Sequence, residues 1–102
     1  MKANLPERLK AWHNDNMSSL KSRGVKIELF ESPPGREKAS FGISLSVDSR
    51  IVYLTAWTTG EVQISSIDLD VDSAPKEEYR ESVLEGDLLE AINDLANWVC
   101  HS

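Results

Sequence analysis

The sequence predicts an α+β fold, a two-layer sandwich in which a four-stranded antiparallel meander sheet carries the N- and C-terminal helices on one face, in the order α-β-β-β-β-α. Residues 40–69 predict the meander, because two short turns join three runs of alternating apolar and polar residues there. Apolar residues at helical spacing flank this region on both sides. Strands with one apolar face need cover on that face only, so both helices are expected on the same side of the sheet.

The N-terminal helix is predicted over residues 5–22. Asn4 is a suitable N-cap residue, Glu7 completes a capping-box pattern, and Pro6 is tolerated in the first turn. Gly24 provides the expected stop. The apolar stripe of this helix consists of Leu5, Leu9, Trp12, Met17 and Leu20.

Four strands are predicted from period-two alternation and from β-branched and aromatic residues. They cover residues 25–30, 40–47, 51–57 and 61–64. After Ile64 the alternation is displaced by one residue, which suggests a β-bulge before the strand continues. On its helix-free face the third strand exposes either Val52, Leu54 and Ala56 or Tyr53, Thr55 and Trp57, because a slip of one residue exchanges the two sets.

The C-terminal part of the chain is predicted to be helical. Residues 76–80 are expected to form a short helical turn, and a longer helix follows. Ser82 and Glu85 form a capping-box pattern at its start, with Gly86 as an alternative first residue. The apolar stripe of this helix consists of Leu84, Leu88, Ala91, Ile92, Leu95 and Val99.

The length and the charge of the chain limit the kinds of partner that the protein is expected to bind. A chain of 102 residues is expected to form one domain over residues 1–102. The net charge is −6, and the acidic residues are concentrated after residue 60. Repulsion from phosphates makes nucleic acid an unfavourable partner, whereas a basic protein surface is the natural complement. The alternative is that the acidity serves only solubility.

Several classes of protein are excluded by what the sequence lacks. No apolar run is long enough to span a membrane, and no apolar segment follows Lys2 as in a secretory signal. The single cysteine, Cys100, rules out an internal disulfide and suits a reducing compartment. We therefore expect a cytoplasmic protein.

The sequence contains no pattern that indicates an enzyme. It has no phosphate-binding loop, zinc spacing or nucleophile elbow, and His13 and His101 lie at opposite ends of the chain. The acidic run from Asp68 to Asp72 alternates like a calcium loop but lacks the required glycine and glutamate at Ser73 and Tyr79. We expect no metal, no cofactor and no catalytic residue.

The candidate functional residues are therefore those that bind another protein. Trp57, at a strand end beside an exposed turn, is the preferred anchor, and the alternative is a core tryptophan under a helix. Three carboxylates would share one face of an extended strand over residues 68–72, where they are either solvated or neutralised by a partner. The expected partner-binding residues are Trp57, Glu61, Asp68, Asp70 and Asp72.

Four short features resemble the TriTu family of bacterial immunity proteins. They are the turn Trp57-Thr58-Thr59-Gly60, Asp68 after the next strand, Trp12 in the first helix and the closing run Leu95-Ala96-Asn97-Trp98. The likeness extends over most of the chain, apart from the connections at residues 31–39 and 69–80.

The resemblance implies an antitoxin made by the producing cell. Its partner would be the ADP-ribosyltransferase toxin domain of an Rhs protein, delivered by a type VI secretion system and acting on elongation factor Tu. The antitoxin would be a monomer that forms a 1:1 heterodimer with the toxin and covers its active or substrate-binding surface. Two alternatives stay open: an acidic secretion chaperone that binds one effector, and a ligand-binding or enzymatic domain.

Overall fold

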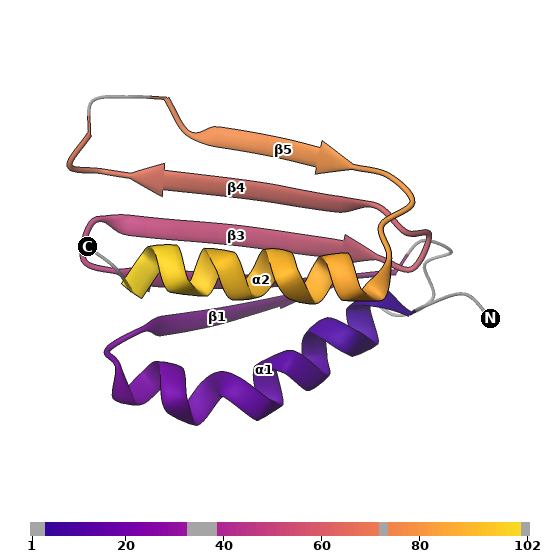
Figure 1. The fold of residues 1–102 in the computed structure, drawn as a ribbon, viewed down its shortest axis with the longest axis horizontal. Helices are drawn as coiled ribbons and strands as arrows, with labels where there is room; N and C mark the ends of the chain where they lie inside the picture. The colour runs from indigo at the N-terminus through magenta and orange to yellow at the C-terminus, as the bar shows by residue number, and fades with distance from the viewer. Residues whose placement is uncertain (1–3, 33–38, 72–73, 101–102) are drawn as a thin grey trace.

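The computed structural model describes residues 4–32, 39–71 and 74–100. Its elements, in chain order, are α1 (Leu5–Ser22), β1 (Lys26–Glu31), β2 (Ser40–Val47), β3 (Arg50–Trp57), β4 (Val62–Asp68), β5 (Lys76–Arg80) and α2 (Glu85–Cys100). The strands form one antiparallel sheet in the order β1-β2-β3-β4-β5. Both helices lie on the same side of this sheet (Figure 1). The α+β class and the antiparallel meander are confirmed.

The predicted number of four strands is wrong, because residues 76–80 form a fifth strand instead of a helical turn. In β5 every residue is exposed, and the strand is held by antiparallel pairing with β4 from Val62↔Arg80 to Ser66↔Lys76. Neither helix covers it in Figure 1. A strand exposed on both faces has no need for apolar alternation, so the usual signal for a strand is missing from its sequence.

The predicted limits of α1 are confirmed at both ends. The side chain of Asn4 accepts a hydrogen bond from the main-chain N–H of Glu7 at 3.3 Å, as expected of an N-cap residue. Gly24 follows the helix with a φ of +84°, a conformation that glycine adopts without steric cost. Local chemistry therefore sets both ends of this helix.

The predicted cap of α2 is wrong. Ser82 has a φ of +53°, outside the extended conformation of an N-cap residue. The first helical hydrogen bond of α2 runs from the N–H of Leu88 to the carbonyl of Leu84 at 3.0 Å. The helix consequently starts at Glu85, and Gly86 lies within its first turn.

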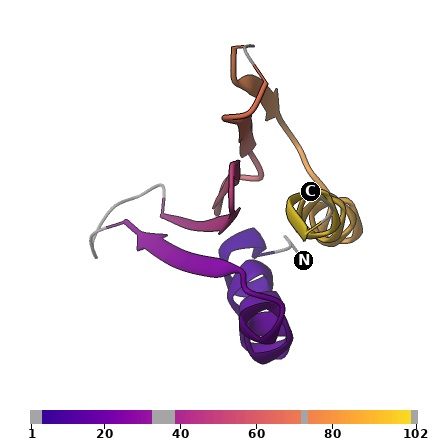
Figure 2. The same cartoon turned by 90° about the vertical axis from the view of Figure 1, so that its left-hand side faces the viewer.

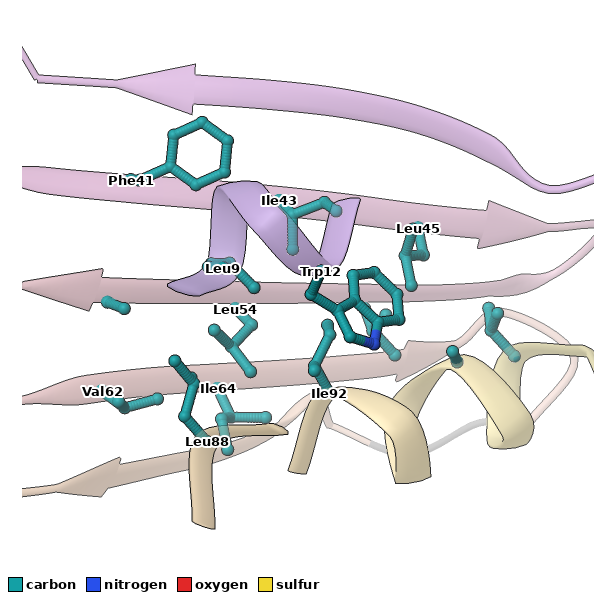
Figure 3. Packing of buried hydrophobic residues seen from close by; sticks show 14 of the residues in the cluster. Leu9, Trp12, Phe41, Ile43, Leu45, Leu54, Val62, Ile64, Leu88 and Ile92 are labelled. Atoms are coloured by element: carbon teal, nitrogen blue, oxygen red, sulfur yellow. The ribbon is translucent and has the colours of Figure 1, made fainter. Parts of the chain in front are cut away.

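The core fills the space between the helices and one face of the sheet. Figure 3 shows side chains of α1 and α2, such as Trp12 and Ile92, gathered over the central strands. The indole Nε1 of Trp12 donates a hydrogen bond of 2.8 Å to Asn93 Oδ1 and so joins the two helices. The largest side chains with almost no exposure are Leu5, Leu9, Ile43, Leu45, Leu54, Leu88, Ile92, Val52, Val62 and Val99.

Strand register decides which face each residue occupies. Ile43, Leu54 and Ile64 lie opposite one another and are buried beneath the helices. The other set, Tyr53, Thr55 and Trp57, therefore occupies the helix-free face. This resolves the alternative that the sequence left open.

The predicted bulge after Ile64 is wrong. Pairing between β3 and β4 continues without interruption from Ala56↔Val62 to Arg50↔Asp68. The apolar pattern changes because Ser66 takes a helix-side position and Ile67 points to the helix-free face, not because a residue is inserted.

The sheet is bent when it is viewed along its strands. β4 and β5 rise away from the plane of β1 and β2, and both helices stay on one side of the bend (Figure 2). Of the described residues, no helical segment is long and apolar enough to cross a membrane. Neither of the two described helices lies on the other face of the sheet.

Candidate partner-binding surface

The predicted partner-binding residues fall at opposite ends of the sheet. Trp57 ends β3 and Glu61 precedes β4, whereas Asp68 ends β4 and Asp70 follows it. The six steps from Val62 to Asp68 correspond to roughly 20 Å along the strand. Asp72 lies outside the described residues. The structure does not gather these residues into one patch.

The Asp68 carboxylate accepts hydrogen bonds from residues of the same chain. Its Oδ1 accepts hydrogen bonds from the N–H of Asp70 at 3.0 Å and from Ser49 Oγ at 3.2 Å, and its Oδ2 accepts one from Arg50 Nε at 3.2 Å. The Asp70 N–H has the largest effect and holds the pKa of the Asp68 carboxyl below its usual range. Burial has the next largest effect and raises this pKa, and the Arg50 guanidinium and the Ser49 hydroxyl lower it again. Asp68 therefore braces the end of β4.

Asp70 lies in the turn after β4 and is exposed. Its Oδ2 accepts a hydrogen bond from Ser49 Oγ at 2.8 Å, and the N–H of Leu69 donates to the carbonyl of Ser49 at 2.8 Å. The expected extended strand over residues 68–72 is wrong, because β4 ends at Asp68 and the chain turns there. The Asp70 side chain lies at the surface.

Trp57 lies on the helix-free face and is half-buried, outside the core formed under the helices. Its main-chain N–H donates to the carbonyl of Glu61 at 3.0 Å, and its carbonyl accepts from the N–H of Gly60 at 3.1 Å. The alternative of a core tryptophan under a helix is wrong for Trp57. Trp12, in contrast, is buried in that core.

The β3–β4 turn is anchored to the start of α2. Gly60 has a φ of +99°, and its carbonyl accepts a hydrogen bond from the N–H of Val83 at 2.9 Å. The hydroxyl of Thr59 donates to the Glu61 carboxylate. Glu61 is therefore placed by the turn, at the same end of the sheet as Trp57.

Three aromatic residues were not selected from the sequence. Phe30, Tyr53 and Tyr79 expose 48%, 40% and 52% of their surface and belong to β1, β3 and β5. The strand register places all three on the helix-free face. The sequence of β3 shows that Tyr53 alternates with apolar residues. It does not show which of the two sets the helices cover.

A hollow on the helix side, with a volume of about 340 Å³, separates the end of α2 from the β4–β5 hairpin. Trp98, Asp68 and Lys76 lie along its walls. Within the parts of the chain that are described, no group of three or more His, Cys, Asp or Glu side chains is arranged to hold a metal ion.

Comparison with known proteins gives one family. The model of the family described as immunity protein TriTu matches residues 7–98, which extend from the first turn of α1 to the last turn of α2. No curated protein and no solved structure gives a significant match.

Proposed function

Because the chain belongs to the TriTu family of immunity proteins, we propose that it binds a cognate ADP-ribosyltransferase toxin domain and covers the active or substrate-binding surface of that domain. The bound toxin then no longer modifies elongation factor Tu of the producing cell. The protein acts in the cytoplasm as one half of a 1:1 complex, by occupying a surface and without turning over a substrate. The toxin belongs to an Rhs protein of a type VI secretion system.

The observation that carries this proposal is the extent of the family match. Residues 7–98 include all five strands and nearly all of both helices. The match therefore concerns the whole fold and not one short motif. A protein of this family is defined by protection from a toxin, and binding is the direct way to give it.

The charge distribution supports a basic partner. Glu61 and Asp70 lie near the two ends of the sheet, and the chain as a whole has a net charge of −6. A field of this sign speeds encounter with a positively charged surface. We propose that Trp57 supplies an apolar contact and that Glu61, Asp68 and Asp70 attract the toxin, although the oxygens of Asp68 are already bonded within the chain. Asp72, which lies outside the described residues, completes the proposed contact set.

The test is protection of cells and of purified elongation factor Tu. Co-expression with the toxin domain encoded beside this gene is expected to restore growth, and the purified protein should block ADP-ribosylation at a 1:1 molar ratio. A mass measurement should give a heterodimer. Continued modification of elongation factor Tu in the presence of excess protein would overturn the proposal.

A further inference from the structure

The helix-free face of the three central strands carries no charged side chain. Charged residues make up 27% of the sequence, yet every position that β2, β3 and β4 present to this face is uncharged. The six central positions are Gly42, Ser44, Tyr53, Thr55, Gln63 and Ser65. Among the residues of the five strands, charges occur on this face only at the edges, where β1 places Lys26 and Glu28 and β5 places Glu77.

Exposed aromatic rings lie on the same face, with Tyr53 inside the uncharged region and Phe30 and Tyr79 on the edge strands. The rings of Phe30 and Tyr53 are 6.4 Å apart between centroids, at an angle of 43°. Gly42 lies between their strands, and a Cβ there would come within 3.1 Å of Thr55 Oγ1 and 3.6 Å of Phe30 Cβ. The missing side chain leaves room for the Thr55 hydroxyl, whereas the distance to Phe30 Cβ is an ordinary contact. Tyr79 adds a third exposed ring on β5, opposite Gln63.

The size and composition of this face suit the centre of a protein interface. Across all five strands, including the edges that carry Lys26, Glu28 and Glu77, four spacings between strands give a width of roughly 19 Å, and seven residues give a length of roughly 23 Å. The projected area of roughly 450 Å² is more than half of the surface of about 800 Å² that each partner contributes to a typical stable complex. Depletion of charge together with enrichment of aromatic residues characterises the buried centre of such interfaces.

We propose that this helix-free face, centred on Tyr53 and Ser65 and extended by Tyr79, is the surface that contacts the toxin domain. The inference rests on the proposed immunity function. It assigns a complementary uncharged surface to the toxin, with basic groups outside that surface. A second copy of the chain is disfavoured as the occupant, because two molecules that each carry a net charge of −6 repel one another.

Changes on this surface and changes of the acidic residues should affect different rate constants of binding. Groups that are desolvated in the complex determine mainly how slowly it dissociates, whereas exposed charges determine mainly how fast it forms. Changes on the uncharged face should therefore raise the dissociation rate constant at every salt concentration. Changes of Asp70 should act on association and be screened by salt.

The test places a charge at the centre of the face. Ser65→Lys is compared with Ser18→Lys, the same change at an exposed position of α1. Binding to a catalytically inactive form of the toxin domain is measured by biolayer interferometry, and thermal unfolding of each variant verifies the fold. Ser65→Lys should weaken binding at least about 100-fold, because the lysine and the Glu77 carboxylate opposite it would both lose their water at the centre of the complex. Ser18→Lys should stay within about twofold of the wild type.

A second pair of variants tests the aromatic contact without adding charge. Tyr79→Ser removes an exposed ring from the face, and Leu84→Ser removes an exposed apolar side chain elsewhere. Tyr79→Ser should weaken binding about 10-fold or more and Leu84→Ser much less. Neither residue is in the buried core, so both variants should fold.

The outcomes distinguish the surface from the function. If the wild type binds the toxin and both Ser65→Lys and Tyr79→Ser bind equally well, the surface assignment is overturned and the immunity function stands. If Ser65→Lys abolishes a dimer of the free protein but not toxin binding, a second copy is the occupant and the assignment is also overturned. If the wild type neither binds nor inhibits the toxin, the proposed function is wrong, and this inference, which rests on it, is wrong as well.

Discussion

The Nη1 of Arg50 donates a hydrogen bond of 2.7 Å to the carbonyl oxygen of Trp98, and the guanidinium carbon lies 4.7 Å from the centroid of the Trp98 ring. Trp98 is in the last turn of α2, where carbonyl groups lack helical partners and a cation is favourable. The Nε of the same guanidinium donates to Asp68. One side chain of β3 therefore ties the end of α2 to the end of β4.

Replacement of Arg50 by methionine should destabilise the protein. The apolar stem is kept, but the charged hydrogen bond to the Trp98 carbonyl is lost, at a cost of about 1 to 2 kcal/mol in the free energy of unfolding. Arg8→Met is the control, because the ion pair of Arg8 with Glu85 is more exposed and should contribute less than about 0.5 kcal/mol. Urea unfolding measures both variants. Equal stability of the two would contradict the bracing role of Arg50.

Acid should remove the stabilisation that Asp68 provides. Because the folded-state pKa of Asp68 is lowered, its contribution is present above the pKa of the unfolded chain, about 3.9. It is lost as the pH falls from there through the lower pKa of the folded state. The difference in unfolding free energy between the wild type and Asp68→Asn should accordingly be constant from about pH 6 to 8 and shrink below about pH 4. Urea titrations at a series of pH values measure this difference.

The Arg50→Met background provides the control for this titration. Arg50 is one of the donors that lower the pKa of Asp68, so the acid-dependent change should be smaller when the guanidinium is absent. A difference that does not vary with pH in the wild-type background would show that the carboxylate is not stabilised by folding.

Sequence reasoning succeeded where structure is specified by neighbouring residues. The limits of α1 follow from Asn4 and Gly24, which act on their own helix ends. It failed for β5, because this strand is held by pairing with β4 and its sequence has no apolar face to bury. It also misread Ser66 and Ile67, because the change of pattern there reflects which face is covered and not an inserted residue.

The candidate site was harder to predict because it depends on contacts between distant parts of the chain. Asp68 was selected as a partner-binding residue for its charge, but its partner Arg50 lies 18 residues away and meets it only through the β3–β4 register. The exposed aromatic residues Phe30, Tyr53 and Tyr79 share one face but come from three strands, no two of which are adjacent in the sheet. Alternation within a strand shows which residues share a face. Only the packing of the helices decides which of the two faces stays exposed.

Substitution of Gly60 by alanine should weaken the β3–β4 turn. At a φ of +99° a Cβ is strained, which costs about 1 to 2 kcal/mol, although its nearest neighbour, the Cα of Ser82, would lie at an ordinary contact distance of 3.7 Å. Gly86→Ala is the matched control, since nothing lies within 4 Å of its Cβ position in the first turn of α2. That variant should gain about 0.5 to 1 kcal/mol from lower chain entropy. Thermal unfolding that shows the same change for both variants would contradict the role of Gly60.

Reversal of the charge at Asp70 should slow association with the toxin. The Asp70 carboxylate is exposed and accepts a bond only from Ser49 among the hydrogen bonds described, so Asp70→Lys should leave the fold intact while changing the local field. The association rate constant should fall several-fold at low salt, and the difference should narrow near 1 M salt, where screening acts within about 3 Å. Stopped-flow mixing measures both conditions.

Asp15→Lys, an equal change of net charge on α1, separates local attraction from net charge. Association that is unaffected by Asp70→Lys at low salt would remove Asp70 from the proposed contact set and would leave the proposals for the protective function and for the uncharged face unchanged.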